Sequence, residues 1–486
     1  MIEHHFAAVL AMIGIVIIVS SLLSGAVERS GLPEVAIFLL VGAVLGPSGL
    51  GLVELALDSP TLRVIATLAL VLVLFTDAIG ADIGEIRQQR RLAALILGPG
   101  TLVPAALVAV AAWLLLDLSP AMAAILGAAL ASTDPVLLRT LIRHPDLPPS
   151  ARLGLRLESG MNDVILLPVV VLAMLALYGG AGAEANGVAR RVMGLFLLGP
   201  VLGALTGYVA ITLLDQVRRR VGVRRDYESL YALGVAFTAF AAAEAVGGSG
   251  FLAAFAAGLV IAWLDVELCD CFLDYGEASA EMFLLLSFVA FGTGLIWTGV
   301  SVAGDWRVLL FAVLALSIRT AVLLPVLARS GIDRRSRRLI ALFGPRGLSS
   351  LLLVLLPVFA GIPGAERLFV VTCLVVLLSV IVHGGGIALY LRRDGRSGAP
   401  AAVPVAHTAP AVQPEPSTPE RITMDELLGL QRSGAPVILA DVRTERSYRD
   451  DPNMAAGAIR LPPDDAVRLA RERRLDQHAT LVLYCA

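Results

Sequence analysis

Two short polar segments interrupt long apolar runs and contain the residue types that could bind and exchange ions. The first reads Ser132-Thr133-Asp134-Pro135. The second reads Glu158-Ser159-Gly160-Met161-Asn162-Asp163, and the apolar run after it contains no further charge until Glu184. Ionisable groups inside a bilayer are costly and are therefore functional candidates by default. Hard cations prefer oxygen ligands such as carboxylates, hydroxyls and carbonyls. The two segments predict a cation site within a membrane.

The spacing inside the second segment divides its polar residues between two helical faces. Ser159 and Asp163 are four residues apart and share one face, whereas Glu158 and Asn162 share the neighbouring face. Burial disfavours the charged form of a carboxylate, so that a proton can compete with a cation for it. This competition is the simplest physical basis of an antiporter. The ion ligands predicted in this way are Asp163, Ser159, Asp134 and the backbone carbonyl near Thr133.

Both halves of the chain contain an apolar segment that should break at a proline. Pro135 lacks an N–H and disfavours helix at the residue before it, so the first break is expected near Asp134. The second break is expected at Gly344-Pro345-Arg346-Gly347. Two interrupted spans in corresponding positions indicate a transporter with inverted repeats and a site where the two spans cross. The alternative is that proline and glycine only kink two helices.

Three further charged residues lie within apolar segments. A lone buried cation at Arg319 would be costly, so we expect it to pair with an acid, and Glu158 is the available carboxylate. Asp77 is either an ion ligand or a carboxylate at a helix end. Arg346 either neutralises carbonyls of the second broken span or pairs with a nearby acid.

The composition places the chain among polytopic membrane proteins. Of its 486 residues, 57% are hydrophobic and 16% are charged, and the mean hydropathy is +0.82. The net charge of -2 gives no indication of nucleic-acid binding. The four cysteines form neither a disulfide framework nor a zinc ligand set. No basic segment precedes the first apolar run, which we therefore interpret as a retained span. No cofactor is expected beyond the transported ions.

Thirteen apolar stretches have approximately the length of a membrane span. They lie near 6–27, 33–46, 62–80, 92–116, 121–142, 153–178, 192–214, 229–246, 250–263, 280–299, 306–328, 338–360 and 367–390. Alternate connections contain twenty-one arginines on one side and five on the other. The positive-inside rule therefore predicts an external N-terminus and a cytoplasmic C-terminus.

The composition changes after the last span. Residues 1–392 form the predicted membrane domain, and residues 393–420 are rich in Pro, Ala, Ser and Thr, which predicts a flexible linker. In residues 421–486, a helix is expected at 424–431 and strands at 437–442 and 481–485. We expect a small α/β domain within which the chain ends.

With these residues in view, the chain resembles the NhaP-type sodium/proton antiporters of the first monovalent cation/proton antiporter family. The resemblance covers residues 1 to about 392. It rests on the two polar segments, on Gly248-Ser249-Gly250-Phe251-Leu252-Ala253 and on Phe343-Gly344-Pro345-Arg346-Gly347. It implies an all-α fold of about thirteen helices with two broken crossing helices. It also implies a homodimer, in which a core domain moves relative to a dimerisation domain.

The resemblance also implies roles for the site residues. Asp163 is implied to be the exchanging carboxylate, and Glu158 with Arg319 a structural ion pair. The neutral Asn162 before Asp163, in place of a second acid, resembles the electroneutral branch, which exchanges one cation for one proton. Thr76-Asp77 departs from the Glu-Gly sequence common at that point. The implied Na⁺ ligands are Asp163, Asp134, Ser159 and the Thr133 carbonyl, with Asp77 as a further candidate.

The tail resembles a rhodanese domain. Asp441-Val442-Arg443 and Gly457-Ala458-Ile459-Arg460-Leu461-Pro462 match its opening strand and second loop, and Leu481-Val482-Leu483-Tyr484-Cys485 resembles the strand before its nucleophilic cysteine. A sulfurtransferase thiolate needs a loop of backbone N–H groups after Cys485. Only Ala486 follows it, so we expect no persulfide chemistry and interpret the tail as regulatory.

The sequence thus predicts a secondary antiporter, not an enzyme, that exchanges Na⁺, or alternatively Li⁺ or K⁺, for H⁺ by alternating access. The expected location is the bacterial inner membrane. One alternative is a K⁺/H⁺ antiporter regulated by its rhodanese-like tail. Another is a membrane-anchored sulfurtransferase or sulfur sensor, for which thirteen spans are excessive. A third is a channel, which buried proton-binding acids disfavour.

Overall fold

The computed structural model divides the chain into two compact units, Met1–Pro400 and Ala401–Ala486, which we call the membrane unit and the C-terminal unit. The structure describes residues 10, 12–19, 22, 34–80, 86, 89–144, 147–178, 192–220, 225–264, 270–397, 427, 436–443, 448, 453–462, 469–470, 473, 475 and 479–484.

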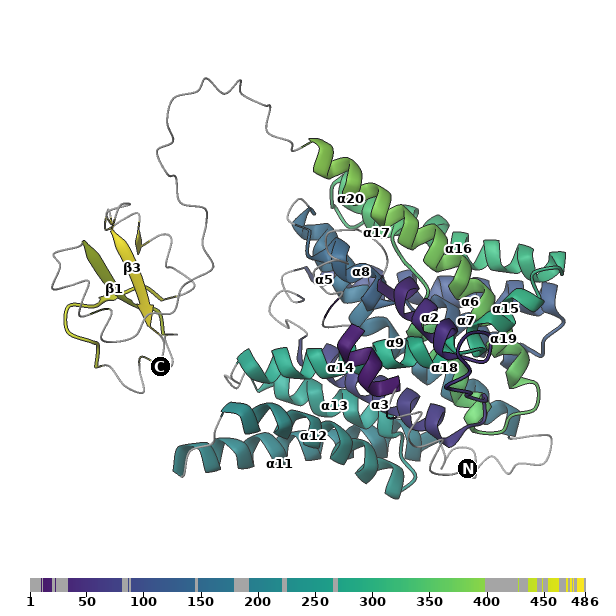
Figure 1. Ribbon diagram of the computed structural model, residues 1–486, viewed down its shortest axis with the longest axis horizontal. Coiled ribbons are helices and arrows are strands. Elements are labelled where there is room, and N and C mark those ends of the chain that lie inside the picture. The colour runs from purple at the N-terminus through teal and green to yellow at the C-terminus, as the bar shows by residue number, and fades with distance from the viewer. Residues whose placement is uncertain are drawn as a thin grey trace. The chain divides into compact units, whose positions relative to one another are not determined.

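The described part of the membrane unit is helical and contains two groups of packed helices (Figure 1). The first bundle consists of α2 (Glu34–Leu45), α3 (Pro60–Ile79), α11 (Gly199–Arg220), α12 (Arg225–Ala245), α13 (Gly250–Trp263) and α14 (Asp270–Gly292). The second bundle consists of α5 (Arg90–Leu97), α6 (Pro99–Leu116), α7 (Pro120–Ala131), α8 (Pro135–Ile142), α9 (Pro149–Tyr178), α16 (Trp306–Leu327), α17 (Arg334–Leu342), α18 (Leu348–Phe359), α19 (Ala365–Ser379) and α20 (Gly385–Ser397).

Four short elements connect or extend the helices in the described part of the membrane unit, and a few helices contact each other across the boundary between the two bundles. The short elements are η1 (Gly194–Leu198), η2 (Leu295–Trp297), α15 (Thr298–Ser301) and η3 (Val380–Gly384), of which η1 and η3 are π-helical turns. Helices α3 and α14 of the first bundle also contact α18 of the second, and α3 contacts α9. Buried apolar side chains from both bundles form one large cluster.

Among the described residues, seven helices are long and apolar enough to cross a membrane, and an eighth span results if Ala278–Gly292 and Leu295–Ser301, bent by 58°, are taken together. Four further apolar helices in the same part of the chain have only 10–17 residues. The prediction of a mostly helical polytopic membrane protein is confirmed. The thirteen predicted stretches exceed the clear spans because several of them form these shorter helices, and the first, at 6–27, lies mostly outside the described residues.

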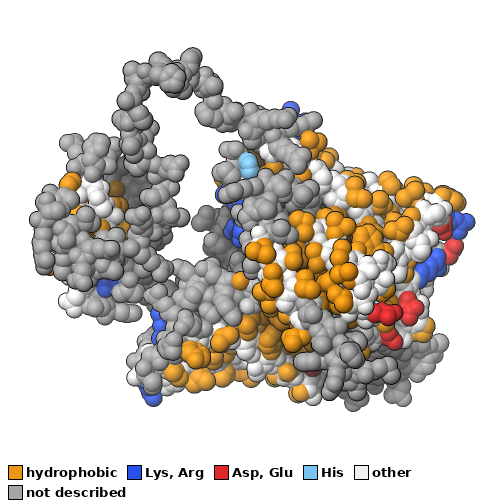
Figure 2. Space-filling view, in the orientation of Figure 1, with side chains coloured by type: hydrophobic (Ala, Val, Ile, Leu, Met, Phe, Trp, Pro, Cys, Tyr) orange, Lys and Arg blue, Asp and Glu red, His pale blue; other side chains and the backbone are white. Residues whose placement is uncertain are grey.

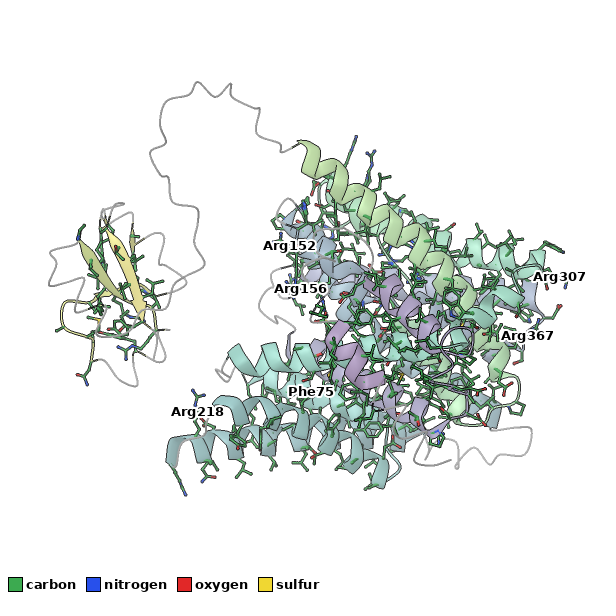
Figure 3. All side chains as sticks on the ribbon, viewed as in Figure 1. Phe75, Arg152, Arg156, Arg218, Arg307 and Arg367 are labelled. Carbon is green, nitrogen blue, oxygen red and sulfur yellow. The ribbon has the colours of Figure 1, made fainter. Side chains whose placement is uncertain are left out.

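The surface of the membrane unit has the distribution of side chains that a bilayer requires. Figure 2 shows hydrophobic side chains over the middle of one face, with charged side chains toward its ends. In Figure 3, Arg152, Arg156 and Arg218 lie toward one end of the helices, whereas Arg307 and Arg367 lie toward the opposite end. The first end is called the arginine-rich end below.

Both predicted breaks are present. Helix α7 ends at Ala131 and α8 begins at Pro135, with Asp134 in the extended N-cap conformation. Helix α17 ends at Leu342 and α18 begins at Leu348. Proline suits the first position of a helix because it has no N–H to leave unsatisfied there. Each break therefore divides one apolar span into two half-helices, whose terminal N–H and C=O groups have no hydrogen-bond partner within their own helix.

The described part of the C-terminal unit contains a three-stranded parallel sheet in the order β2-β1-β3. Its strands are β1 (Val437–Asp441), β2 (Ile459–Arg460) and β3 (Thr480–Tyr484), so the strands predicted at 437–442 and 481–485 are confirmed. Asp441 is buried and accepts hydrogen bonds from the Arg443 guanidinium, which lower the pKa of its carboxyl group. The helix predicted at 424–431 falls mostly on residues outside the described part, and Cys485 lies outside it as well.

Candidate functional site

The two breaks meet inside the membrane unit and are joined by hydrogen bonds. The backbone N–H of Asp134 donates to the carbonyl oxygen of Pro345 at 2.9 Å. The backbone N–H of Leu348 donates to Oδ2 of Asp134 at 2.5 Å. Segments more than two hundred residues apart in the sequence are thus in direct contact where both lack helix.

Asp134 is the N-terminal cap of two half-helices at once. Its Oδ1 accepts hydrogen bonds from the N–H groups of Val136 and Leu137, at 2.8 and 3.1 Å, in the first turn of α8. Its Oδ2 accepts from Leu348 in the first turn of α18. Helix N-termini carry unsatisfied N–H groups and partial positive charge, both of which a carboxylate offsets. This buried carboxylate therefore stabilises both breaks.

Arg346 neutralises the opposite end of the first break. Its Nη1 donates to the carbonyl oxygens of Ala131 and Ser132, at 2.8 and 2.9 Å, and to Oγ1 of Thr133 at 3.2 Å. The two carbonyls terminate α7, where the helix dipole is negative. These carbonyls belong to the fifth predicted span and not to the twelfth, whereas the acid nearby that the sequence offered as an alternative is represented by Glu158, whose charge acts on Arg346.

Asp163 lies in the middle of α9 and faces the break after α7. Its Oδ1 accepts a short hydrogen bond from the hydroxyl of Ser132, and the Ser349 hydroxyl of α18 also lies beside its carboxylate. Asp134 is close enough for the two acids to repel each other when both are charged. All four side chains are at least 95% buried. Two carboxylates and two hydroxyls thus surround one point between the breaks.

Thr133 and Asn162 supply further buried oxygen atoms. The hydroxyl of Thr133 donates to Oε1 of Glu158 at 3.2 Å, so its side chain belongs to the network around Glu158. Its backbone carbonyl accepts no hydrogen bond from any described residue. The fully buried amide of Asn162 likewise has no hydrogen-bond partner within the described part of the chain. Unsatisfied buried oxygens suit a cation as their partner.

The ion pair expected from the sequence is present. Nε and Nη2 of Arg319 donate to Oε1 and Oε2 of Glu158, both at 2.5 Å. The same guanidinium donates to the carbonyl oxygens of Ile340 and Ala341 at the end of α17. The pair is only 3–4% exposed. Arg319 therefore holds together α9, α16 and the end of the first half of the second broken span.

Ser159 and Asp77 lie apart from this centre, on a pocket of about 400 Å³. The hydroxyl of Ser159 donates to the carbonyl oxygen of Arg156 in its own helix at 3.4 Å. Asp77 reaches the same pocket from α3, and a Cβ atom added to Gly160 would lie 3.6 Å from its Cγ. Of the predicted ligands, Asp163 and Asp134 therefore lie together with Thr133, whereas Ser159 and Asp77 line the adjoining pocket.

Sequence reasoning missed three hydroxyl groups at the site. Ser132 was part of a recognised segment, but no role was assigned to it. Ser349 and Ser379 were not considered, although Ser379 Oγ accepts the backbone N–H of Arg346 at 2.6 Å. Ser132 lies in the first break and Ser349 at the start of α18, so their positions in the sequence carried a weak signal. Ser379 ends α19, 33 residues after Arg346, and carried no such signal. Among the described residues there is no cluster of three His, Cys, Asp or Glu side chains that could hold a metal ion.

The profile of the transmembrane sodium/hydrogen exchanger family matches residues 15–393. The K⁺/H⁺ antiporter NhaP2 of Shewanella sp. strain MR-4 is 26% identical over 406 residues, which cover 82% of this chain and 68% of that protein. The Na⁺/H⁺ antiporter NhaH of Halobacillus dabanensis is 28% identical over 374 residues, which cover 72% and 89%.

The fold of the membrane unit is also similar to that of a solved structure. The sodium proton antiporter MjNhaP1 of Methanocaldococcus jannaschii, determined at pH 8, matches with a TM-score of 0.63 at 18% identity, over 80% of this chain and 99% of that one. The family profile covers more than half of the present chain. The chain therefore belongs to the sodium/hydrogen exchanger family, and it is accordingly a monovalent cation/proton antiporter and not an enzyme.

Proposed function

We propose that the protein exchanges one monovalent cation for one proton at a site centred on Asp163. The observation that carries this proposal is the position of Asp163, which is buried beside Ser132 and Asp134 where the two broken helices meet. The remaining ligands in this proposal are Asp134 and the Thr133 carbonyl, together with Ser159 and Asp77 from the adjoining pocket. Because broken backbone at membrane depth is tolerated where it lines a site, the geometry favours ion binding over a simple kink.

The exchange follows from the cost of a buried charge. With neither ligand bound, the Asp163 carboxylate would carry an uncompensated negative charge while almost completely buried. Either a proton on the carboxylate or a cation beside it removes this charge. Only one of the two can do so at a time, so binding of the cation releases the proton. The neighbouring Asn162 is neutral and adds no second exchangeable proton, which supports one-for-one exchange.

Alternating access requires the site to face each side of the membrane in turn. The two bundles suit this, because the ion site lies in the second bundle and the pocket beside it is lined by both. We propose that the arginine-rich end faces the cytoplasm. Figure 3 supports this orientation, since the labelled arginines expected inside and those expected outside lie at opposite ends. The N-terminus would then be external, in a bacterial inner membrane.

The transported cation is proposed to be Na⁺, with K⁺ as the second candidate. The oxygen donors at the site suit either ion, and the names of the relatives include both a K⁺/H⁺ and a Na⁺/H⁺ antiporter. A series of LiCl, NaCl and KCl additions to proteoliposomes distinguishes them. An apparent affinity for Na⁺ at least tenfold higher than for K⁺ would support the first assignment, and the reverse would support the second.

Three structural proposals accompany the function. The short apolar helices are proposed to complete thirteen spans together with the first predicted span. A homodimer is proposed, and its expected signature is a doubled mass in detergent after subtraction of the micelle. The C-terminal unit is proposed to be rhodanese-like and regulatory, which its parallel sheet and the buried Asp441–Arg443 pair support.

The decisive experiment measures exchange in proteoliposomes with an imposed pH gradient. Added Na⁺, Li⁺ or K⁺ should dissipate the gradient with the wild-type protein, and Asp163→Asn should abolish this response. Wild-type exchange by Asp163→Asn would refute the proposed site. Repeating the assay with K⁺ and valinomycin, which fix the membrane potential, tests electroneutrality: a rate that follows the imposed potential would exclude one-for-one exchange.

A further inference from the structure

We propose that Arg139 and Glu281 form a gate, an ion pair that joins the two bundles beside the ion site and must open during each transport cycle. Arg139 lies on α8 of the second bundle and Glu281 on α14 of the first, and their side chains are in direct contact. This inference rests on the alternating-access function proposed above. It assigns a transport role to two residues that the ion site itself does not use.

The position of the pair connects it to the site. Helix α8 begins at the Asp134 cap, so Arg139 lies about one turn further along the same helix. Arg139 is close enough to Asp134 to act on its charge electrostatically. A movement that separates α8 from α14 must therefore break the ion pair and change the field at the ion site together.

The Arg139–Glu281 pair lies at the wall of the cavity that it would close. Both Arg139 and Glu281 line the cavity of about 400 Å³, whose wall also includes Pro135, Ser159 and Gly160 from the two helices that carry the site. Arg156 lines the same cavity and marks the arginine-rich end in Figure 3. The pair thus bridges the space through which an ion from this end would approach Ser159 and Asp163.

The strength of the pair suits an element that opens and closes. The side chains of Arg139 and Glu281 are 26% and 30% exposed, and ion pairs in contact with water contribute little net free energy. The Glu158–Arg319 pair lies wholly within the second bundle and is almost completely buried, so breaking it in every cycle would be costly. The exposed Arg307–Asp117 pair also lies within the second bundle and provides a matched control.

The electrostatic consequence can be measured. While Glu281 neutralises Arg139, the arginine opposes a cation at Asp134 only weakly. Once the pair opens, the uncompensated positive charge near Asp134 disfavours the bound cation. Glu281→Gln should therefore weaken the apparent cation affinity at least threefold. Arg139→Gln combined with Glu281→Gln should restore it, and Asp117→Asn should leave it unchanged. An unchanged affinity in Glu281→Gln would overturn this electrostatic role.

A cross-link tests the gate directly. In a variant with the four native cysteines replaced by serine or alanine, Arg139→Cys and Glu281→Cys are joined in the folded protein by a bifunctional thiosulfonate reagent. Exchange in proteoliposomes should fall at least tenfold and should recover on reduction. The same reagent on Arg307→Cys with Asp117→Cys should have no effect. An undiminished rate in the cross-linked protein would overturn the gate, because the two bundles would then not need to separate there.

A readout without transport keeps this inference separate from the proposed function. In the detergent-solubilised protein, Glu281→Gln should increase deuterium uptake in α8 (Pro135–Ile142), and Asp117→Asn should not. Equal deuterium uptake of α8 in Glu281→Gln and Asp117→Asn would overturn the gate, even if the wild-type protein exchanged ions as proposed. Failure of the wild-type protein to respond to any cation would instead refute the proposed exchange, whereas the deuterium uptake would still decide the gate.

Discussion

Glu158 and Arg319 form a bidentate ion pair in which both guanidinium–carboxylate contacts measure 2.5 Å, although the residues are separated by 161 positions in the sequence. The same guanidinium also holds the last carbonyls of α17. One arginine thus fixes the position of a broken span against the helix that carries Asp163.

Glu158→Gln should lower the yield of folded protein much more than it changes ion affinity. Removing one partner of a buried ion pair leaves an uncompensated charge and costs about 3–5 kcal/mol. The yield of monodisperse protein in detergent measures this loss, and the apparent cation affinity of the remaining protein is measured in proteoliposomes. Arg319→Ala should behave similarly. A normal yield with a greatly altered affinity would place the pair inside the ion site.

Gly347→Ala should separate the two broken spans. A Cβ atom at this position would collide with Oδ2 of Asp134, the atom that caps α18. Loss of an N-terminal cap costs about 0.5–2 kcal/mol, so the thermal unfolding temperature in detergent should fall and exchange should slow. Gly234→Ala is the matched control, because no atom lies within 4 Å of its added Cβ. If both variants unfolded at the same temperature, the close approach would have no energetic importance.

Arg346→Met should abolish exchange, because it leaves the carbonyls of Ala131 and Ser132 without their donor in a buried setting. Arg346→Lys should recover part of the activity, since an ammonium can reach one carbonyl but lacks the planar fork of a guanidinium. Exchange rates and folded yields of the two variants are compared. Full activity of Arg346→Met would show that the end of α7 needs no neutralising charge.

Ser132→Ala should weaken apparent cation affinity at fixed pH. The hydroxyl of Ser132 stabilises the Asp163 carboxylate, and hydrogen bonds to charged groups contribute about 1.5–3 kcal/mol. The apparent Kd should therefore rise by about tenfold or more. Ser350→Ala is the control, because the buried hydroxyl of Ser350 has no hydrogen-bond partner among the described residues. Equal affinities in the two variants would remove Ser132 from the site.

Asp441→Asn should loosen β1 in a pH-dependent manner. Arg443 lowers the pKa of Asp441 in the folded protein, so its stabilisation is complete above the ordinary carboxyl pKa of about 3.9 and is lost as the pH falls through the lowered value. Deuterium uptake of residues 436–443 in the full chain should be higher in the variant between pH 5 and 8 (about one to four units above the ordinary value). The difference should shrink in more acidic buffer. A difference that persisted unchanged in acid would exclude the carboxylate charge as its cause.

Local physics explains which parts of the site could be predicted. Pro135 and Pro345 predict the two breaks because each lies beside polar or glycine residues, which weaken the helix further. Proline alone does not suffice, since Pro104, Pro168, Pro325 and Pro357 lie inside helices. Arg319 predicts its partner, because an unpaired buried cation is too costly to leave. These inferences depend on the nature of a residue and on its immediate neighbours. They do not require knowledge of how distant helices pack.

The remaining features depend on tertiary packing. That Asp134 caps α18 as well as α8 follows only once a segment 214 residues away is placed beside it. The contact of Ser132 with Asp163 depends on the rotation of α9 against the end of α7. The count of thirteen spans stays a prediction, because hydropathy alone cannot distinguish a full span from a short apolar helix such as α2, which has 12 residues.

The double cap at Asp134 also links the movement of the two broken helices to each other. Because one carboxylate holds the starts of α8 and α18, neither half-helix can slip without releasing the other. The two crossing segments are thus constrained to move as one body, and in the proposed function a bound ion moves with them. If that linkage were loosened, as in Gly347→Ala, slower exchange would be accompanied by an uncoupled leak, in which protons or cations pass without their counterpart.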